Sequence, residues 1–155
     1  MMPMIAGLAR LFFSFHGRAA RTAFWLVSFV WFVLAEAFSA WWSERGLALA
    51  ERHEHTIVNA ALVLGALPML VSCFAICVRR LHDRDKGAWW LLVFLVCPIL
   101  LEITASVNTF DPGPVVAFMT TSLVLSLWGF IELGCVPGTS GPNRYGLDPL
   151  LEEAA

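Results

Sequence analysis

The sequence predicts an all-α membrane protein: a four-transmembrane-helix bundle with a short N-terminal interfacial amphipathic helix and an irregular C-terminal tail. Two observations predict this class. Hydrophobic residues make up 59% of the chain and charged residues only 14%, whereas soluble domains carry about 25% charged residues. In addition, four apolar runs of roughly 20 residues follow one another, and each is long enough to cross a hydrocarbon core of about 30 Å.

Each apolar run contains at most one charged residue. The runs extend over about 22–42, 56–78, 88–107 and 115–136, within a single membrane domain that covers residues 1–150. Prolines inside two of the runs are compatible with membrane helices, which tolerate proline as a kink. Four buried helices of a soluble bundle would need polar stripes at helical period, and these runs have none. Lipid is therefore the expected solvent of all four helices.

Basic residues predict how the helices are threaded. They cluster before the first helix and between the second and third, and the loop around Asp111 has none. Because positive residues mark the cytoplasmic side, we expect both termini and the 79–87 loop in the cytoplasm. Trp25, Trp89 and Trp90 would then lie at the inner ends of helices, at the level of the lipid headgroups.

The first eighteen residues predict a short amphipathic helix on the inner membrane surface. Ile5, Leu8, Phe12 and Phe15 recur at helical spacing, and Arg10 lies elsewhere on the helical wheel. Arg10 also interrupts the apolar run, which argues against a secretory signal peptide. A frayed terminus is the alternative.

Three polar motifs interrupt the apolar pattern. They are "FHGRAARTAFW" (15–25), "RRLHDRDKGAWW" (79–90) and "GTSGPNRYGLDP" (138–149). The third motif belongs to a turn-rich cytoplasmic tail, 137–155, whose prolines and glycines cannot continue a helix. Such a tail could fold back beneath the bundle and bring residues 143–148 near His82 and Asp83.

In this order and topological position, the motifs resemble domain-of-unknown-function family 805, the YhaH-like small bacterial inner-membrane proteins. The resemblance covers nearly the whole chain. It implies a four-helix protein of the bacterial inner (plasma) membrane with all three motifs on the cytoplasmic side, and it implies no activity. The chain departs from the family pattern at Gly87–Ala88, where a serine hydroxyl is usual, and at Thr22–Ala23, where a charged pair is usual.

The polar motifs suggest a ligand- or lipid-binding layer. Its candidate residues are Arg18, Arg21, Arg79, Arg80, His82, Asp83, Trp89, Asn143 and Arg144. Arginines beside tryptophans can hold anionic lipid headgroups, which favours a non-enzymatic lipid-, ligand- or partner-binding protein. His82 and Asp83 could instead serve a membrane-embedded enzyme as base and orienter, although no nucleophile signature accompanies them and no catalytic residue is assigned. A third interpretation is that the charges merely fix the loop and the threading.

Three glutamates lie at membrane depth, where an ionisable group is costly and usually faces the bundle interior. Glu36 and Glu102 follow tryptophans at similar spacing, so they are expected at similar depth. They could share a proton or bind a cation in a small channel or transporter. Glu132 could pair with Arg79 or Arg80. The alternative for all three is a hydrogen bond to a neighbouring Ser, Thr or Trp.

The sequence predicts no cofactor, no metal site and no nucleic-acid partner. A metal site from Cys77, His82 and Cys135 can be drawn, but cysteines in apolar helices are ordinary packing residues. Small residues in the second helix would permit close packing in a homo-oligomer or against a membrane-protein partner.

Overall fold

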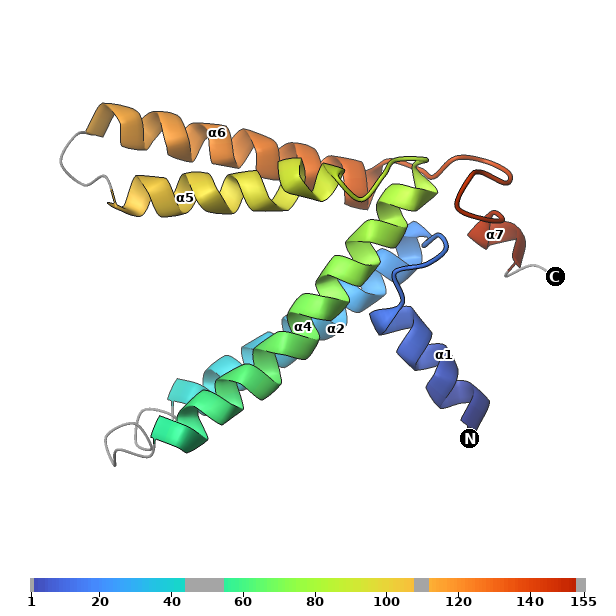
Figure 1. The fold of residues 1–155 in the computed structure, drawn as a ribbon, viewed down its shortest axis with the longest axis horizontal. Coiled ribbons are helices and arrows are strands. Elements are labelled where there is room, and N and C mark those ends of the chain that lie inside the picture. Colours follow the sequence, from blue (N-terminus) through green and yellow to red (C-terminus); the bar gives the residue numbers. More distant parts are fainter. Residues whose placement is uncertain (1, 44–54, 108–111, 153–155) are drawn as a thin grey trace. The chain divides into compact units, whose positions relative to one another are not determined.

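The protein is built of helices (Figure 1). The computed structural model describes residues 2–43, 55–107 and 112–152, and this part of the chain contains no β-strand. Its helices are α1 (Met2–Phe13), α2 (Arg21–Trp41), α4 (His55–Asp83), α5 (Cys97–Val107), α6 (Pro112–Phe130) and α7 (Pro149–Glu152), with π-helical turns η2 (Leu92–Val96) and η3 (Ile131–Cys135). The all-α class is confirmed for these residues.

Several helical segments have the length and composition of membrane spans. Three are long and apolar enough to cross a membrane: Arg21–Trp41, Val63–Asp83 and Pro112–Cys135. Leu92–Val107 is apolar but shorter. The structure therefore confirms apolar helices in all four predicted runs, whereas a count of four membrane crossings stays a prediction.

The observed helix bounds differ from the predicted ones in ways that local chemistry explains. The second helix continues five residues past 78 to Asp83, because its last polar side chains find partners that hold them in helical conformation. The fourth begins at Pro112 instead of 115, since proline is well suited to the first helical position. The third apolar run begins with turns closed by i→i+3 hydrogen bonds, such as Leu91 N–H to Ala88 O. Its regular α-helix, α5, starts only at Cys97.

By its contacts the chain divides into two units, which are described separately. The first comprises residues 1–15 and 25–76, and the second comprises 16–24 and 77–155. The predicted single domain over 1–150 stays a prediction.

In the first unit, α2 and α4 lie side by side (Figure 1). The indole N–H of Trp31 donates to the Ser72 hydroxyl at 2.7 Å, which gives this fully buried hydroxyl a partner within an apolar contact. The Phe12 ring of α1 meets Trp31 edge to face at a centroid distance of 6.2 Å. The N-terminal segment is thus helical, and its position at a membrane surface stays a prediction.

In the second unit, α5 and α6 lie side by side (Figure 1). Pro98 has no N–H to donate to Phe94 O, four residues earlier. The N–H of the preceding residue, Cys97, donates to Leu92 O, and this bond closes the π-helical turn η2. The Phe94 ring packs edge to face on Trp128 at 5.1 Å. Gly129 makes this packing possible because it has no side chain at the contact.

We expect Gly129→Ala to destabilise the α5–α6 pair. A Cβ at this position would lie 2.9 Å from Phe94 Cβ, so the ring must shift, and overpacking of this kind costs about 1–3 kcal/mol. Thermal unfolding of the purified protein in detergent measures the loss. Gly65→Ala is the matched control, because its Cβ would meet nothing closer than Phe38 Cε2 at 3.9 Å. Equal melting temperatures for both variants would contradict this account of the contact.

Candidate functional site

The second polar motif begins on a helix and not in the expected loop. Residues 79–83 form the end of α4. The helix then closes in a Schellman motif: the Lys86 N–H donates to Leu81 O at 2.8 Å and the Asp85 N–H to His82 O at 3.0 Å. Asp85 has a φ of 55°, a left-handed conformation that Asp tolerates better than most side chains. This cap fixes where the polar side chains of α4 point.

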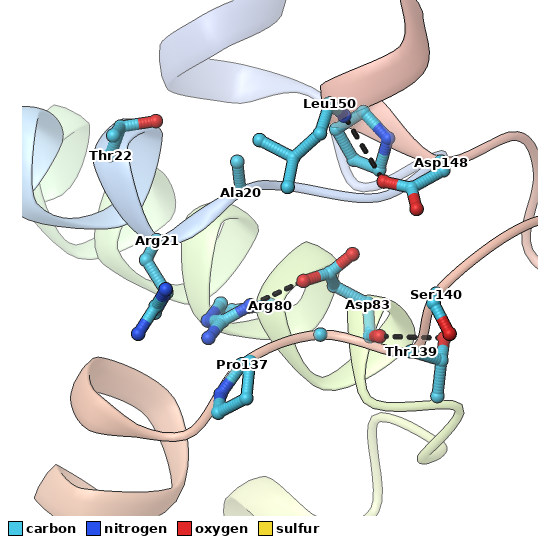
Figure 2. Close-up of a pocket in the computed structure, with 12 residues that line it drawn as sticks. Ala20, Arg21, Thr22, Arg80, Asp83, Pro137, Thr139, Ser140, Asp148 and Leu150 are labelled. Atoms are coloured by element: carbon cyan, nitrogen blue, oxygen red, sulfur yellow. Dashed lines mark hydrogen bonds and ion pairs between the residues drawn. The ribbon is translucent and has the colours of Figure 1, made fainter.

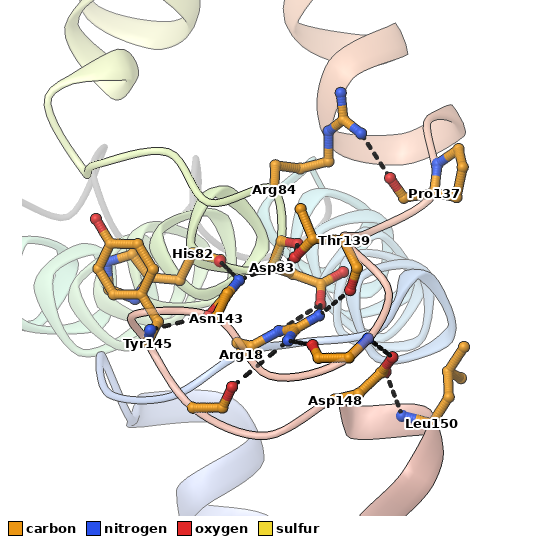
Figure 3. A network of polar contacts seen from close by, with 12 residues as sticks. Arg18, His82, Asp83, Arg84, Pro137, Thr139, Asn143, Tyr145, Asp148 and Leu150 are labelled. Atoms are coloured by element: carbon orange, nitrogen blue, oxygen red, sulfur yellow. Dashed lines mark hydrogen bonds and ion pairs between the residues drawn. The ribbon is translucent and has the colours of Figure 1, made fainter.

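Asp83 is the centre of the polar motifs, because two arginines converge on its carboxylate. Figure 2 shows Arg80 directed at Asp83, and its Nη1 donates to Oδ2. Figure 3 shows Arg18 at the same carboxylate, with Nε 3.0 Å and Nη2 2.9 Å from Oδ1. The side chains of Arg18, Arg80 and Asp83 are only 1%, 0% and 5% exposed. We call these three residues the Asp83 clamp.

Backbone carbonyls of η3 and of the residue that follows it accept two further hydrogen bonds from Arg80. Its Nε donates to Leu133 O at 2.7 Å, and its Nη2 donates to Val136 O. Leu133 O has no α-helical partner, because the residue four positions on is Pro137, which has no N–H. The Val136 N–H bonds instead to Ile131 O at 3.1 Å and closes η3. The π-helical turn therefore presents acceptors to a buried guanidinium.

The tail supplies the acceptors for Arg18. Its guanidinium donates to Thr139 O at 2.5 Å and to Gly141 O at 2.6 Å (Figure 3). Thr139 also donates its N–H and its hydroxyl to the backbone carbonyl of Asp83, at 2.8 and 3.0 Å. At Gly138 the tail passes so close that a Cβ would collide with the Asp83 carboxylate. The tail is thus bonded to both the side chain of Arg18 and the backbone of α4.

His82 also contacts the tail, and its ring is held by groups other than the Asp83 carboxylate. Its ring stacks on Tyr145 with centroids 3.8 Å apart and an interplanar angle of 7°, and its Nδ1 lies 3.2 Å from Gly17 O. The Asn143 amide donates to His82 O at 2.9 Å (Figure 3). Because Asp83 is held by arginines instead, the two residues do not form the base-and-orienter pair that an enzyme would need.

Other candidate residues lie around the clamp in different environments. Arg144 forms an exposed ion pair with Asp85 at 3.1 Å. Trp89 is 58% exposed and stacks on Trp90 at 4.4 Å. Arg79 is buried. Arg144 also lies 4.9 Å from the ring centroid of Tyr145, the residue that stacks on His82, so it is the one of these three that adjoins His82.

Glu132 pairs with two residues that follow α4. Its Oε1 accepts from Arg84 Nε at 3.1 Å and from Lys86 Nζ at 2.6 Å, and its side chain is 9% exposed. Lys86 also lies 4.8 Å above the ring of Trp90. The Schellman motif explains the choice of partner, because it turns the chain so that Arg84 and Lys86 reach η3.

The other two glutamates belong to different units. Glu36 lies in the first, and Glu102 lies in the second, where its carboxylate is 2.9 Å from the Ser122 hydroxyl. That hydroxyl is also 3.2 Å from Pro98 O. The sequence has no Lys, Arg or His over 87–143, so hydrogen bonding to serine is the interaction that the α5–α6 pair offers Glu102. A proton-sharing pair of Glu36 and Glu102 stays a prediction.

A cavity of about 200 Å³ adjoins the clamp (Figure 2). Its walls are the start of α2, the end of α4 and the tail. Its charged lining residues are Arg21, Arg80, Asp83 and Asp148. Arg21 is exposed and donates to Cys135 O at 3.2 Å, which uses one of its five N–H donors. Of the two cations that line this cavity, Arg80 is buried and Arg21 is exposed.

Asp148 fixes the end of the tail. It accepts from the Gly141 N–H at 2.9 Å and from the Leu150 N–H at 3.1 Å. The second bond caps α7, which begins with Pro149 at its first position, as N-capping chemistry favours. Asp148 therefore joins the turn at Gly141 to the last described helix.

Sequence reasoning missed several residues of this site. Thr139, Arg84 and Lys86 lie within the quoted motifs but were not among the candidates, although a hydroxyl and two cations beside polar neighbours were a visible signal. For Pro137 the sequence predicts only that, like the other tail prolines, it cannot continue a helix. No three His, Cys, Asp or Glu side chains gather as a metal ion would require within 2–43, 55–107 and 112–152.

Comparison with known proteins shows that the chain is similar to proteins named as inner-membrane proteins of Escherichia coli. The profile of a family described as "Protein of unknown function (DUF805)" matches residues 12–147. The chain is 33% identical to the uncharacterized protein YiiR of Escherichia coli (strain K12), over 88% of this chain and 86% of that one. It is 30% identical to the inner membrane protein YhaH of the same organism, over 90% and 89%, and 26% identical to the inner membrane protein YhaI, over 88% and 86%. No solved structure matches.

We expect Asp83→Asn to loosen the tail and lower the stability of the second unit. The substitution leaves two buried guanidinium groups without their carboxylate, and breaking a buried ion pair costs about 3–5 kcal/mol. Thermal unfolding in detergent and the rate of proteolysis within 137–152 measure both effects. Asp85→Asn is the control, because its pair with Arg144 is about half exposed and such pairs contribute at most about 1 kcal/mol. The clamp would be unimportant if both variants behaved alike.

Acidification should release the tail turn that Asp148 holds. The Gly141 N–H, and then that of Leu150, lower the pKa of this carboxyl below its ordinary value of 3.8. A depressed folded pKa means that the contribution is fully present above the ordinary value and is lost as the pH falls through the folded one. The amide NMR signals of Gly141 and Leu150 should therefore shift together below about pH 4. Asp148→Asn should abolish this transition; its persistence in the variant would assign it to another group.

Proposed function

The chain belongs to the DUF805 family, and on this premise we propose that it is a multi-pass inner-membrane protein that binds anionic lipid headgroups without catalysing a reaction. In the proposed topology it crosses the membrane four times, with both termini and the three polar motifs in the cytoplasm. The excess of Lys and Arg in the motifs supports this orientation. The relatives YhaH and YhaI, whose names state an inner-membrane location, support the compartment.

The observation that supports lipid binding is that the arginines of the polar motifs differ in exposure and in how many of their N–H groups are bonded within the protein. Arg18 and Arg80 are buried, and their guanidinium groups are held by Asp83 and by backbone carbonyls. They stabilise the fold and cannot also reach a headgroup. Arg21 is exposed at the start of an apolar span and spends one donor on Cys135 O. A guanidinium in this position suits the phosphate of an anionic lipid.

The same geometry supports a binding protein over an enzyme. His82 is stacked on Tyr145 and bonded to Gly17 O, and Asp83 is held in the clamp. A general base must be within hydrogen-bond reach of a substrate proton, with a third group to orient it. Neither residue is arranged in that way, so catalysis is not part of the proposal.

Replacing Arg21 by alanine should reduce retention of anionic lipid by about fivefold, since a basic residue near an anionic surface contributes about 1 kcal/mol. Native mass spectrometry of the protein purified from membranes, with phosphatidylglycerol as the added probe, measures the bound fraction. Arg144→Ala is the matched control, because this arginine is exposed but paired with Asp85.

Both variants must keep the wild-type melting temperature for the comparison to count as a binding measurement. Retention of phosphatidylglycerol by a stable Arg21→Ala protein at the wild-type level would overturn the proposed function. Equal losses in the Arg21 and Arg144 variants would do the same, because they would indicate unspecific attraction by surface charge.

A further inference from the structure

The cavity beside the clamp has walls of opposite character. Arg21 lies on the side of Arg80 and Pro137, whereas Asp148 lies on the other side of Asp83, next to Leu150 (Figure 2). Arg80 and Asp83 bond to one another across the wall between them. The cavity therefore offers a hydrogen-bond donor at one side and an acceptor at the other.

The charges in and behind this wall do not cancel. Arg21, Arg80, Asp83 and Asp148 line the cavity, and the buried Arg18 forms an ion pair with Asp83. Three cations and two carboxylates leave one positive charge. A ligand that brings one negative charge neutralises the site, whereas a zwitterionic ligand leaves the excess uncompensated and places a cation near three arginines.

The acceptor side has capacity left. An ionised carboxylate offers about four lone-pair positions, and the two backbone N–H groups of Gly141 and Leu150 occupy two at Asp148. Those N–H groups lower the pKa of Asp148, which keeps it an acceptor near neutral pH. The hydroxyl of Ser140, which is exposed, lines the same side. This side of the cavity suits a ligand with free O–H groups.

We propose that the cavity binds a phosphodiester whose alcohol carries free hydroxyl groups, with its phosphate on Arg21 and its hydroxyls on Asp148 and Ser140. This inference rests on the proposed function and names the headgroup that the site takes. A glycerol headgroup such as that of phosphatidylglycerol has this chemistry, and so does the soluble glycerophosphoglycerol. An ethanolamine headgroup does not, because it carries an ammonium and no net charge.

The experiment compares headgroups on the full-length protein in neutral detergent. Short-chain phosphatidylglycerol and phosphatidylethanolamine are titrated separately and followed by native mass spectrometry. We expect phosphatidylglycerol to bind about tenfold more tightly, the ratio that one charged hydrogen bond produces. Ser140→Leu, which replaces a lining hydroxyl by an apolar side chain, and Asp148→Asn should each reduce that ratio toward one, and melting temperatures show whether they fold.

The outcomes separate this inference from the proposed function. Equal affinity of the wild-type protein for the two lipids overturns both the cavity assignment and the proposed function, because phosphatidylethanolamine carries no net charge. An unchanged ratio in the folded Ser140→Leu and Asp148→Asn variants overturns the cavity assignment alone. Such a result leaves general anionic-lipid binding by Arg21 intact, because that binding is judged by the Arg21 and Arg144 variants. Competition by glycerophosphoglycerol at the same concentration as the lipid supports the cavity chemistry and identifies a soluble source for the ligand.

Discussion

The buried carboxylate of Asp83 between two arginines is the constraint on which the rest of the second unit depends. An arginine cannot lose its proton in a protein, so Arg18 and Arg80 remain charged when buried. One carboxylate balances only one of them. The surplus must be stabilised by dipoles, because an uncompensated buried charge is strongly destabilising. The carbonyls of Leu133, Val136, Thr139 and Gly141 provide those dipoles. The tail is therefore held by the electrostatics of the clamp, although it has almost no regular structure.

Two prolines make this arrangement possible in the helices. The turns η2 and η3 each close with the N–H of the residue directly before a proline, Cys97 before Pro98 and Val136 before Pro137. A proline removes the donor that an α-helix would supply to the carbonyl four residues earlier. At Leu133 the freed carbonyl receives Arg80 instead. Helix ends whose carbonyls lack partners are normally capped by water or side chains, and here the cap is a guanidinium from another helix.

Composition and run length were enough to predict apolar helices, because a helix must be mostly apolar and about 20 residues long to cross the hydrocarbon core of a bilayer. The partners of the charges were not predictable in the same way. The second motif places four cations and two carboxylates within eight positions, so many different ion pairs between these groups and the rest of the chain are equally consistent with the sequence. The outcome depends on where α4 ends: Asp83 faces Arg18, 65 positions away, while the turn at Asp85 sends Arg84 and Lys86 to Glu132. These pairings therefore cannot be predicted before the end of α4 and the fold-back of the tail are known.

The basic residues of a membrane protein have two separate uses, and donor counting distinguishes them. A cation can orient the chain in the membrane whether or not it is paired inside the protein, because the positive-inside rule depends on the residue type. Binding a headgroup requires donors that the fold has not consumed. In the first motif these uses fall to different residues only three positions apart: Arg18 is consumed by the clamp, and Arg21 retains donors at the start of an apolar helix. Arg18 lies in the non-helical segment before α2, whereas Arg21 is the first residue of that helix, so the change in backbone conformation between them allows one guanidinium to be buried and the other exposed.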